Sequence, residues 1–257
     1  MPATPRCLIT RRAAEDSQTP FLSVQDGFLT THTVESVLRP EPEFMKEFVG
    51  KAEDKLFNLM DPANPIMSGV VQNQDAYMKG KIAQRWYYDR VEPALEDAFA
   101  EFHRKTGRRY DFIDAYRCED AEYVLVGMGS YMETAQITID YLREQGVKAG
   151  CLNIYCFRPF PAKRIVDVLR TTKAFSVIER MDDPLSTTGN HLTREIKAAF
   201  YDATTGQGGQ ERLESMPRIY HGAAGLGSRD VRPGDINAIF DNMIHDGQDF
   251  FVVGIKH

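Results

Sequence analysis

The chain has 257 residues, of which 42% are hydrophobic and 26% are charged, and its formal net charge is −6. This composition is typical of a folded globular protein and excludes a chain dominated by disorder. The acidic balance gives no general attraction to nucleic acid, and no apolar run reaches the ~20 residues of a membrane-spanning helix, so we expect no nucleic acid and no membrane as partners.

The N-terminus and the cysteines indicate a cytoplasmic protein. Residues 1–12 (MPATPRCLITRR) contain no continuous apolar core of signal-peptide length. The four cysteines form no C-x-x-C pair, and the six histidines are dispersed along the chain. We therefore expect reduced thiols, no metal site and no iron–sulfur cluster bound by this chain. The cysteines are Cys7, Cys118, Cys151 and Cys156.

Few regular elements are predicted at the start of the chain. The segment RRAAEDSQTP (11–20) is at most the tail of a helix. PFLSV (20–24) has the pattern of a short buried strand, and the turn QDGF follows it. Thr30 or the next threonine can then cap a helix.

Helical patterns dominate the next third. PEPEFMKEFVG (40–50) places its apolar residues on one face of a short helix. A proline-rich loop (61–69) separates it from a longer helical stretch that begins near Ala76 and that Pro93 breaks or kinks. The apolar stripe near and after this proline predicts a core-facing helix, which Gly107 ends. The stripe consists of Val91, Leu95, Ala98, Phe99 and Phe102.

From residue 120 onward, strands alternate with helices. Three apolar strands are predicted at 123–126, 151–157 and 175–179, with helical segments between them. A strand, a glycine turn and a helix follow within 216–243, and FFVVGI (250–255) is a last strand. The β-α-β-α-β order of apolar strands predicts a parallel sheet covered by helices on both faces.

Polar loops at the strand ends are the candidates for chemistry. GMGS (127–130) opens a helix, so its backbone amides can face an anion, but a tight strand–helix turn is the simpler interpretation. GLGS (225–228) is a second turn of this kind. Asp26 and His32 flank the DGFLTTH turn, and Arg158 can meet an anionic ligand or cap a neighbouring element. Without a nucleophile beside them, these residues define no reaction.

Several longer motifs occur in order along nearly the whole chain. PFLSVQDGFLTTHTVE (20–35), the stretch 64–88 with GVVQNQD and paired tyrosines, GSYMETA (129–135), RPF (158–160) and Glu179-Arg180 follow one another. In these motifs the chain resembles the pyruvate:ferredoxin (flavodoxin) oxidoreductases, whose segments read P-F-x-H-F-F-D-G-F-R-T-S-H-E, G-x-x-Q-N-x-D, G-S-x-x-E-T-A and R-P-F. PRIYHGAAGLGSRDVRPGDINAIFDNM (217–243) also resembles a segment of that family.

The resemblance implies a fold and a division into domains. It implies an α/β protein with parallel sheets covered by helices. Residues 1–115 would be a partial thiamine-enzyme pyrimidine-binding domain, and residues 116–257 would form a transketolase C-terminal-like domain. The missing strands before residue 20 would leave Phe21, Leu22 and Val24 in an unpaired edge strand, which twenty N-terminal residues cover poorly. We therefore expect the chain alone to be oligomeric.

The resemblance also implies an activity. Enzymes of this family decarboxylate a 2-oxoacid on thiamine diphosphate, pass electrons through iron–sulfur clusters to ferredoxin or flavodoxin, and make acyl-CoA from coenzyme A. The chain would be a segment or subunit of such an enzyme, with pyruvate as the default substrate, and would contribute scaffold and interface. The alternative is a non-catalytic binding module or a truncated remnant of such an enzyme.

No Asp-Gly-Asp-type diphosphate motif occurs in the chain. Thiamine diphosphate, Mg and the iron–sulfur clusters would therefore belong to the assembled enzyme, and we expect the isolated chain to bind none of them and to be inactive. Its partners would be the remaining domains or subunits, with ferredoxin or flavodoxin as indirect partners.

The resemblance places several residues near the substrate or cofactor without giving any of them a catalytic role. These residues are Asp26, Thr30, His32, Gly129, Ser130, Glu133 and Arg158. The family's Arg and Ser after D-G-F are Leu29 and Thr31 here. The missing arginine removes an expected ion-pair partner of Asp26.

Overall fold

The computed structural model describes residues 3–34 and 36–255, which divide into two compact units. The first unit holds the described residues up to Gln25 together with Val34–Asp111. The second unit holds Asp26–Thr33 together with the described residues from Phe112 onward. No helix in the described part of the chain is long and apolar enough to cross a membrane.

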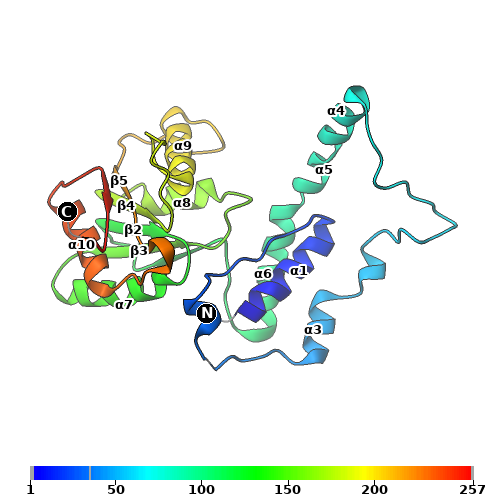
Figure 1. Cartoon of the computed structure of the whole chain (residues 1–257), viewed down its shortest axis with the longest axis horizontal. Coiled ribbons are helices and arrows are strands. Elements are labelled where there is room, and N and C mark those ends of the chain that lie inside the picture. Colours follow the sequence, from blue (N-terminus) through cyan, green and yellow to red (C-terminus); the bar gives the residue numbers. More distant parts are fainter. Residues whose placement is uncertain (1–2, 35, 256–257) are drawn as a thin grey trace. The chain divides into compact units, whose positions relative to one another are not determined.

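The regular elements in the described part of the first unit are all helices, joined by long loops (Figure 1). Its elements are α1 (Ala3–Ser17), α3 (Pro42–Val49), the 3-10 helix η1 (Ala52–Asp54), α4 (Gln74–Ala83), α5 (Arg85–Tyr88) and α6 (Val91–Thr106). Helix α6 carries the predicted apolar stripe and ends at Gly107, whose φ of +72° suits a glycine.

Helices α1, α3 and α6 share one apolar core. Ile9 and Ala13 of α1 are buried, and α1 packs against both α3 and α6. Phe48 of α3 and Phe102 of α6 meet edge to face, with ring centroids 5.4 Å apart. Phe44 stacks on Phe48 at 5.7 Å and therefore extends the same cluster. Aromatic pairs of this geometry contribute stability beyond their buried area.

Two predictions for the start of the chain are wrong. Residues 3–17 form a full helix whose Ile9 and Ala13 are buried, so the N-terminal residues do cover an apolar face. Residues 20–24 form no strand, and the Leu22 and Val24 side chains in this segment are 92% and 85% exposed. An apolar run of five residues becomes a strand only where a neighbouring strand supplies hydrogen bonds, and the described part of the first unit has none.

The second unit is built on a six-stranded, mostly parallel sheet. Its strands are β1 (Ile113–Tyr116), β2 (Tyr123–Gly127), β3 (Ala149–Ile154), β4 (Ala174–Glu179), β5 (Arg218–Ala223) and β6 (Phe250–Val252), in the order β1-β3-β2-β4-β5-β6. Only β1 is antiparallel among the described strands, and it lies at an edge beside β3. The sequence pattern does not predict β1, because IDAY (113–116) is too short to show a period.

Helices cover both faces of this sheet, as predicted. They are α7 (Tyr131–Glu144), α8 (Ala162–Leu169), α9 (His191–Thr205) and α10 (Pro233–Ile244), with the short α2 (Leu29–His32) and the 3-10 helix η2 (Leu226–Ser228) in loops. Helices α8 and α9 form one core with the sheet, and α7 and α10 form the other.

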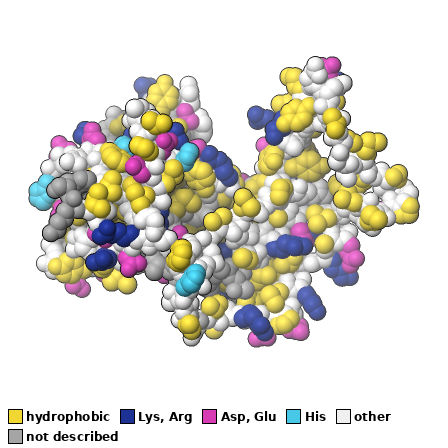
Figure 2. Space-filling view, viewed as in Figure 1, with side chains coloured by type: hydrophobic (Ala, Val, Ile, Leu, Met, Phe, Trp, Pro, Cys, Tyr) yellow, Lys and Arg dark blue, Asp and Glu magenta, His cyan; other side chains and the backbone are white. Residues whose placement is uncertain are grey.

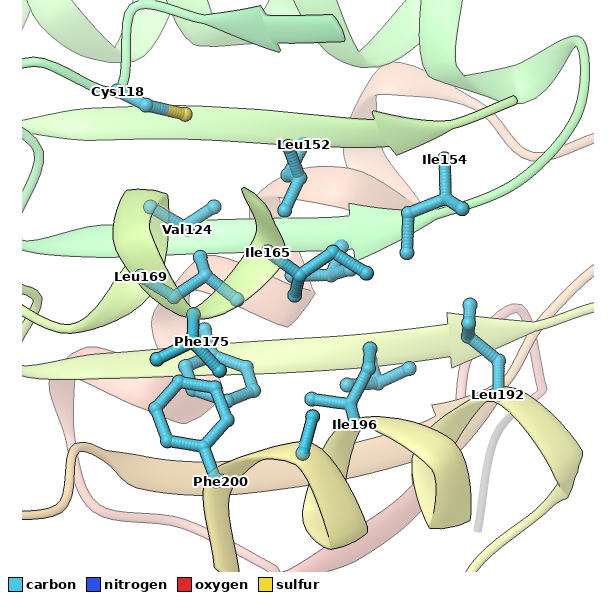
Figure 3. Packing of buried hydrophobic residues seen from close by; sticks show 14 of the residues in the cluster. Cys118, Val124, Leu152, Ile154, Ile165, Leu169, Phe175, Leu192, Ile196 and Phe200 are labelled. Atoms are coloured by element: carbon cyan, nitrogen blue, oxygen red, sulfur yellow. The ribbon is translucent and has the colours of Figure 1, made fainter. Parts of the chain in front are cut away.

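The strand residues alternate between the two cores. Val124 and Val126 point toward α8 and α9, whereas Leu125 between them points toward α7 and α10. Figure 3 shows the first of these cores, where Ile165 and Leu169 of α8 lie over the strands. Because both faces are buried, every residue of β3 and β4 is buried, which explains their largely apolar sequences.

Candidate functional site

The turns after β2 and β4 lie where the helical connections of two neighbouring strands run to opposite faces of the sheet. These strands are parallel neighbours, with Val126 opposite Val177. The chain leaves β2 for α7 on one face and leaves β4 for α9 on the other face. In open parallel sheets this divergence leaves a crevice at the carboxyl ends of the strands, where ligands bind. The side chains that meet at this edge are therefore the candidate site.

The Asp26 carboxylate lies at the N-terminus of α7. Its Oδ2 accepts a hydrogen bond from the backbone N–H of Ser130 at 2.6 Å. Ser130 directly precedes α7, and among the described contacts its own side chain makes no capping bond. The unpaired amides and the positive end of the helix dipole both favour a carboxylate at this position. Asp26 therefore caps α7 from a segment more than a hundred positions earlier in the chain.

Two glycines of the GMGS turn lack a Cβ that would crowd the side chains of Asp26 and Tyr131. Gly129 has a φ of +103°, and a Cβ there would lie 3.0 Å from Asp26 Oδ2. A Cβ on Gly127 would lie 1.8 Å from the Tyr131 hydroxyl, which donates a hydrogen bond to the Ile178 carbonyl at 2.6 Å. Burial raises the pKa of Tyr131, so its hydroxyl stays protonated and remains a donor.

Arg180 supplies the cation beside Asp26. It follows β4 directly, and its Nη1 lies 3.6 Å from Asp26 Oδ2, with both side chains largely buried. Its Nη2 also lies 3.5 Å from the Gly225 carbonyl, in the turn after β5. Leu29 stands where the family has an arginine, and Asp26 takes its ion-pair partner from the end of β4 instead.

Thr30 and His32 are placed near Asp26 in sequence but do not share its contacts. Both lie in α2, where Thr30 is half-buried and His32 is exposed. His32 Nδ1 lies 2.9 Å from Thr31 Oγ1, and the imidazole stacks on Phe28 with centroids 5.2 Å apart. Among the described contacts, His32 is therefore paired with its neighbours rather than with Asp26.

Gly129, Ser130 and Glu133 form the end of the GMGS turn and the first turn of α7, whereas Arg158 has partners elsewhere. Glu133 is exposed and adds a negative charge near the helix N-terminus. Arg158 pairs with Glu195 of α9 at 2.6 Å. The structure thus joins Asp26 with Gly129 and Ser130, and it engages Arg158 in an ion pair on the α9 side.

Sequence reasoning missed two further polar residues of this edge. The family motif includes Arg180 without indicating a role, although a charged residue directly after a buried strand is a usable signal. Glu179 is buried and accepts hydrogen bonds from the backbone N–H of Leu192 at 2.7 Å and from the Thr193 hydroxyl at 2.8 Å. Glu179 thereby caps α9 as Asp26 caps α7.

The assembled groups suit electrostatic capping and ion pairing. Within the described residues, no group of three His, Cys, Asp or Glu side chains is arranged to hold a metal ion. Neither thiamine diphosphate nor an iron–sulfur cluster is therefore assigned to these residues. We derive no catalytic step through either group.

Two family models match the chain. The model described as pyruvate flavodoxin/ferredoxin oxidoreductase, thiamine diphosphate-binding, matches residues 5–100. The model described as pyruvate:ferredoxin oxidoreductase core domain II matches residues 121–236.

Curated relatives match most of the chain. Pyruvate synthase subunit PorA of Thermotoga maritima is 32% identical over 90% of this chain and 56% of that protein. PorA of Methanothermobacter thermautotrophicus is 31% identical over 97% of this chain and 61% of that protein. A Nostoc pyruvate-flavodoxin oxidoreductase is 28% identical over 97% of this chain but only 21% of that protein. The chain thus spans between about a fifth and about three fifths of these relatives.

Solved structures match more distantly. A 2-oxoglutarate:ferredoxin oxidoreductase from Magnetococcus marinus superposes with a TM-score of 0.42 at 14% identity, over 67% of this chain and 24% of that chain. This likeness is too distant to carry an argument about function. Both family models and the curated relatives agree, and the chain belongs to the pyruvate:ferredoxin (flavodoxin) oxidoreductase family, in which it corresponds to a segment of the enzymes.

Proposed function

We propose that the chain contributes scaffold and interface to a 2-oxoacid oxidoreductase, with pyruvate as the default substrate. The remaining domains or subunits supply the reacting cofactors, namely thiamine diphosphate with Mg and the iron–sulfur clusters, and transfer electrons to ferredoxin or flavodoxin. The family models and the names of the relatives support this assignment. The assembly is cytoplasmic and yields acyl-CoA.

An exposed apolar segment of the first unit carries the proposal. Between Leu56 and Tyr88 many large apolar side chains face solvent, and no described residue of α4 or α5 is buried. Val71 is fully exposed and Met67 is 84% exposed. Figure 2 shows hydrophobic side chains gathered along this part of the chain. We call residues 56–88 the apolar arm.

The apolar arm exposes more large apolar side chains along one stretch than a free protein surface normally does. Its exposed members are Leu56, Phe57, Leu59, Met60, Ile66, Met67, Val70, Val71, Tyr77, Met78, Ile82, Trp86 and Tyr88. Scattered exposed apolar residues are ordinary, but a contiguous stretch of this length marks an interaction surface. Burial against a partner stabilises by ~25 cal/mol per Å² of apolar area, so the arm favours association.

The site at the sheet edge supports a scaffolding role. Asp26, Arg180 and Glu179 are engaged with helix N-termini and with one another, rather than with an open reacting position. Asp26, Thr30, His32, Gly129, Ser130, Glu133 and Arg158 remain our proposed substrate- or cofactor-proximal residues in the assembled enzyme.

Co-expression with the missing parts tests the proposal. The full chain would be produced with a cysteine-rich and a diphosphate-binding subunit of a family enzyme from the same genome. We expect a stable complex that reduces viologen with pyruvate and CoA. Met78→Asp in the apolar arm should prevent assembly, because burying an unpaired charge is costly.

Ile137→Asp is the matched control, because Ile137 is 73% exposed but lies on α7 of the second unit. It should leave assembly intact. Assembly that tolerates Met78→Asp would contradict the interface role of the arm. Absence of cysteine-rich and diphosphate-binding reading frames near the coding sequence would favour the remnant instead.

A further inference from the structure

The strand β6 forms an open edge of the sheet in the second unit. It pairs with β5 on one side, and no described strand lies on its other side. The backbone N–H of Val253, which follows β6 directly, donates to the Ala223 carbonyl of β5 at 3.0 Å. Successive residues of a strand direct their backbone groups to opposite sides, so the N–H and C=O groups of Phe250 and Val252 point away from β5. The strand therefore presents four backbone hydrogen-bonding groups at this edge.

This edge lacks the features by which proteins usually prevent pairing with another chain. Such features are charged side chains or prolines on the edge strand and an element that covers it. Residues 250–253 (FFVV) include neither a charge nor a proline, and the Phe250 side chain is exposed. The strand β1, at the opposite edge of the sheet, carries Asp114, and α8 contacts it. Of the two described edges, β6 is therefore the one suited to pair with a further strand.

Carboxylates are in excess at the start of β6. The exposed carboxylates of Asp246 and Asp249 lie 3.9 and 2.7 Å from the Arg218 guanidinium. A cleft on the α9 side, which Asp249 and Phe250 also line, adds three charged residues to this end of the strand, namely Asp182, Asp183 and Lys197. The described groups at the start of β6 are thus four carboxylates against two cations.

Cations are in excess at the other end of β6. A Cβ on Gly254, two residues after the strand, would lie 3.6 Å from Arg229 Nε. Arg229 and Arg232 line a groove of about 720 Å³ that residues 251–255 share with α10. Asp235 is the carboxylate in the lining of this groove, and it accepts a hydrogen bond from the Arg232 backbone N–H at 2.9 Å. The lining at this end thus holds two guanidinium groups against one carboxylate.

We propose that β6 pairs antiparallel with β6 of a second copy of this chain, about a two-fold axis near Phe251. The antiparallel direction places the acidic start of each strand beside the basic end of the other, so the favourable charge contact forms twice. Parallel pairing would instead bring like charges together at both ends. Because both complementary ends belong to the same short strand, a second copy supplies the match that the charges require.

The outward backbone groups set the register of this pair. Placing Phe250 opposite Val252 of the second copy lets all four outward groups of each strand form hydrogen bonds across the axis. Phe251 then lies opposite Phe251 of the second copy, and the two six-stranded sheets become one continuous sheet. The pairing does not involve the apolar arm and is independent of the scaffold role proposed above.

Analytical ultracentrifugation of the full chain tests the pairing. We expect a dimer that dissociates on dilution and that persists in Met78→Asp, which opposes association through the apolar arm. Val252→Lys should raise the Kd of the dimer about tenfold or more, because a lysine on an edge strand opposes pairing. Ile137→Lys is the matched control, since Ile137 is exposed on α7 of the same unit, and it should change the Kd by less than about twofold.

Charge reversal tests the antiparallel direction. Arg229→Glu and Asp249→Lys should each weaken the dimer by about fivefold or more, because each puts like charges beside one another at both ends of the pair. The double variant reverses both members of the contact and should bind more tightly than either single variant. A double variant that dimerises more weakly than both single variants would reject the antiparallel arrangement.

Amide hydrogen exchange followed by NMR locates the contact. The amides of Phe250 and Val252 should exchange about tenfold more slowly in the dimer than in the dilute monomer, because they gain acceptors. The Val253 amide, which already donates to Ala223, is the internal reference and should change little.

Three results would overturn the pairing. One is a chain that stays monomeric at about 200 μM, which is well above the Kd of a functional weak dimer. Another is a dimer whose Kd Val252→Lys leaves unchanged while circular dichroism shows that the variant is folded. The third is protection of the Phe250 and Val252 amides that appears only when a cysteine-rich or diphosphate-binding subunit is added, since that subunit would then cover the edge instead of a second copy.

Discussion

The Asp26 carboxylate completes the N-terminus of α7, which lacks a described side-chain cap of its own. We predict that Asp26→Ala destabilises the second unit by about 1–2 kcal/mol, because the Ser130 amide loses its acceptor and the helix dipole loses a charge. Asp26→Asn keeps an acceptor and should cost less. Urea unfolding of the full chain, followed by tyrosine fluorescence and circular dichroism, measures both.

Asp230→Asn is the control, because Asp230 is exposed and caps no described helix. It should change the free energy of unfolding by no more than about 0.5 kcal/mol. Equal effects at positions 26 and 230 would show that the Asp26 contact contributes nothing specific.

Three of the four cysteines should react at very different rates. Burial raises the pKa of Cys118 to about 12, and burial also raises that of Cys151, so both stay protonated at pH 8. Cys7 is exposed. We predict fast reaction of Cys7 with a disulfide reagent such as DTNB and reaction of Cys118 and Cys151 only after unfolding. Mass spectrometry of the labelled peptides identifies the sites, and rapid native labelling of Cys118 would contradict the buried geometry.

At the residue scale, the sequence predicts which residues are candidates for the site but not which of them lie in contact. The turn around Asp26 makes that residue a candidate, and the place of GMGS between a strand and a helix makes that turn another. Their contact depends on a segment that crosses to the second unit, which no local pattern encodes. The Asp26–Arg180 pair is a clear case, since its members are 154 positions apart and Asp26 reaches the end of β4 from the separate segment Asp26–Thr33.

At the element scale, α1 contributes more than its sequence suggests. Ile9 is 1% exposed, and α1 packs on α3 and α6. Ile9→Ala should destabilise the first unit by about 2–4 kcal/mol, because the deleted methyl groups leave a cavity in a packed core. Chemical unfolding monitored by the Trp86 fluorescence of this unit measures the loss.

The matched control is Ile82→Ala in α4, where the side chain is 57% exposed. It should change stability by less than about 1 kcal/mol, because little buried area is lost. A small effect of Ile9→Ala would mean that α1 does not cover this core in solution.

The strands of the second unit were predictable because their burial is continuous. All residues of β3 and β4 are buried, and such runs flanked by glycine and proline leave little alternative to a strand. PFLSV (20–24) has the same local pattern, yet it is extended coil because no described strand lies beside it in its unit. Helix α1 was missed for the opposite reason, since its buried positions are few and lie among charged residues.

At the scale of the whole molecule, the isolated chain should not oxidise pyruvate. Among the described residues, no group of three or more His, Cys, Asp or Glu side chains is arranged to hold a metal ion. We expect no pyruvate-dependent viologen reduction by the pure chain, with added thiamine diphosphate, Mg and CoA, above the rate without protein. Activity of the pure chain would show that a cofactor site forms from residues that look unsuited to it.

The division into domains makes a last prediction. We propose a boundary near residue 115, and limited proteolysis should leave a resistant fragment that begins between residues 110 and 120. That fragment lacks Asp26–Thr33, which belongs to the second compact unit. A fragment that begins before β1, at residues 110–112, keeps the sheet and both cores complete, so it should stay folded, but α7 loses the Asp26 cap.

Hydrogen exchange tests separately whether the fragment stays folded and whether α7 has lost the Asp26 cap. The amides from Ser130 to Glu133 should exchange faster in the fragment than in the intact chain, by about five- to thirtyfold for a cap worth 1–2 kcal/mol. Asp26→Ala in the intact chain should produce the same acceleration, because it removes the same hydrogen bond. Amides in β4 serve as the internal reference and should not change. Faster exchange in the fragment but not in Asp26→Ala would mean that other residues of the 26–33 segment hold α7, and a protease-resistant core centred on residues 30–100 would reject the boundary itself.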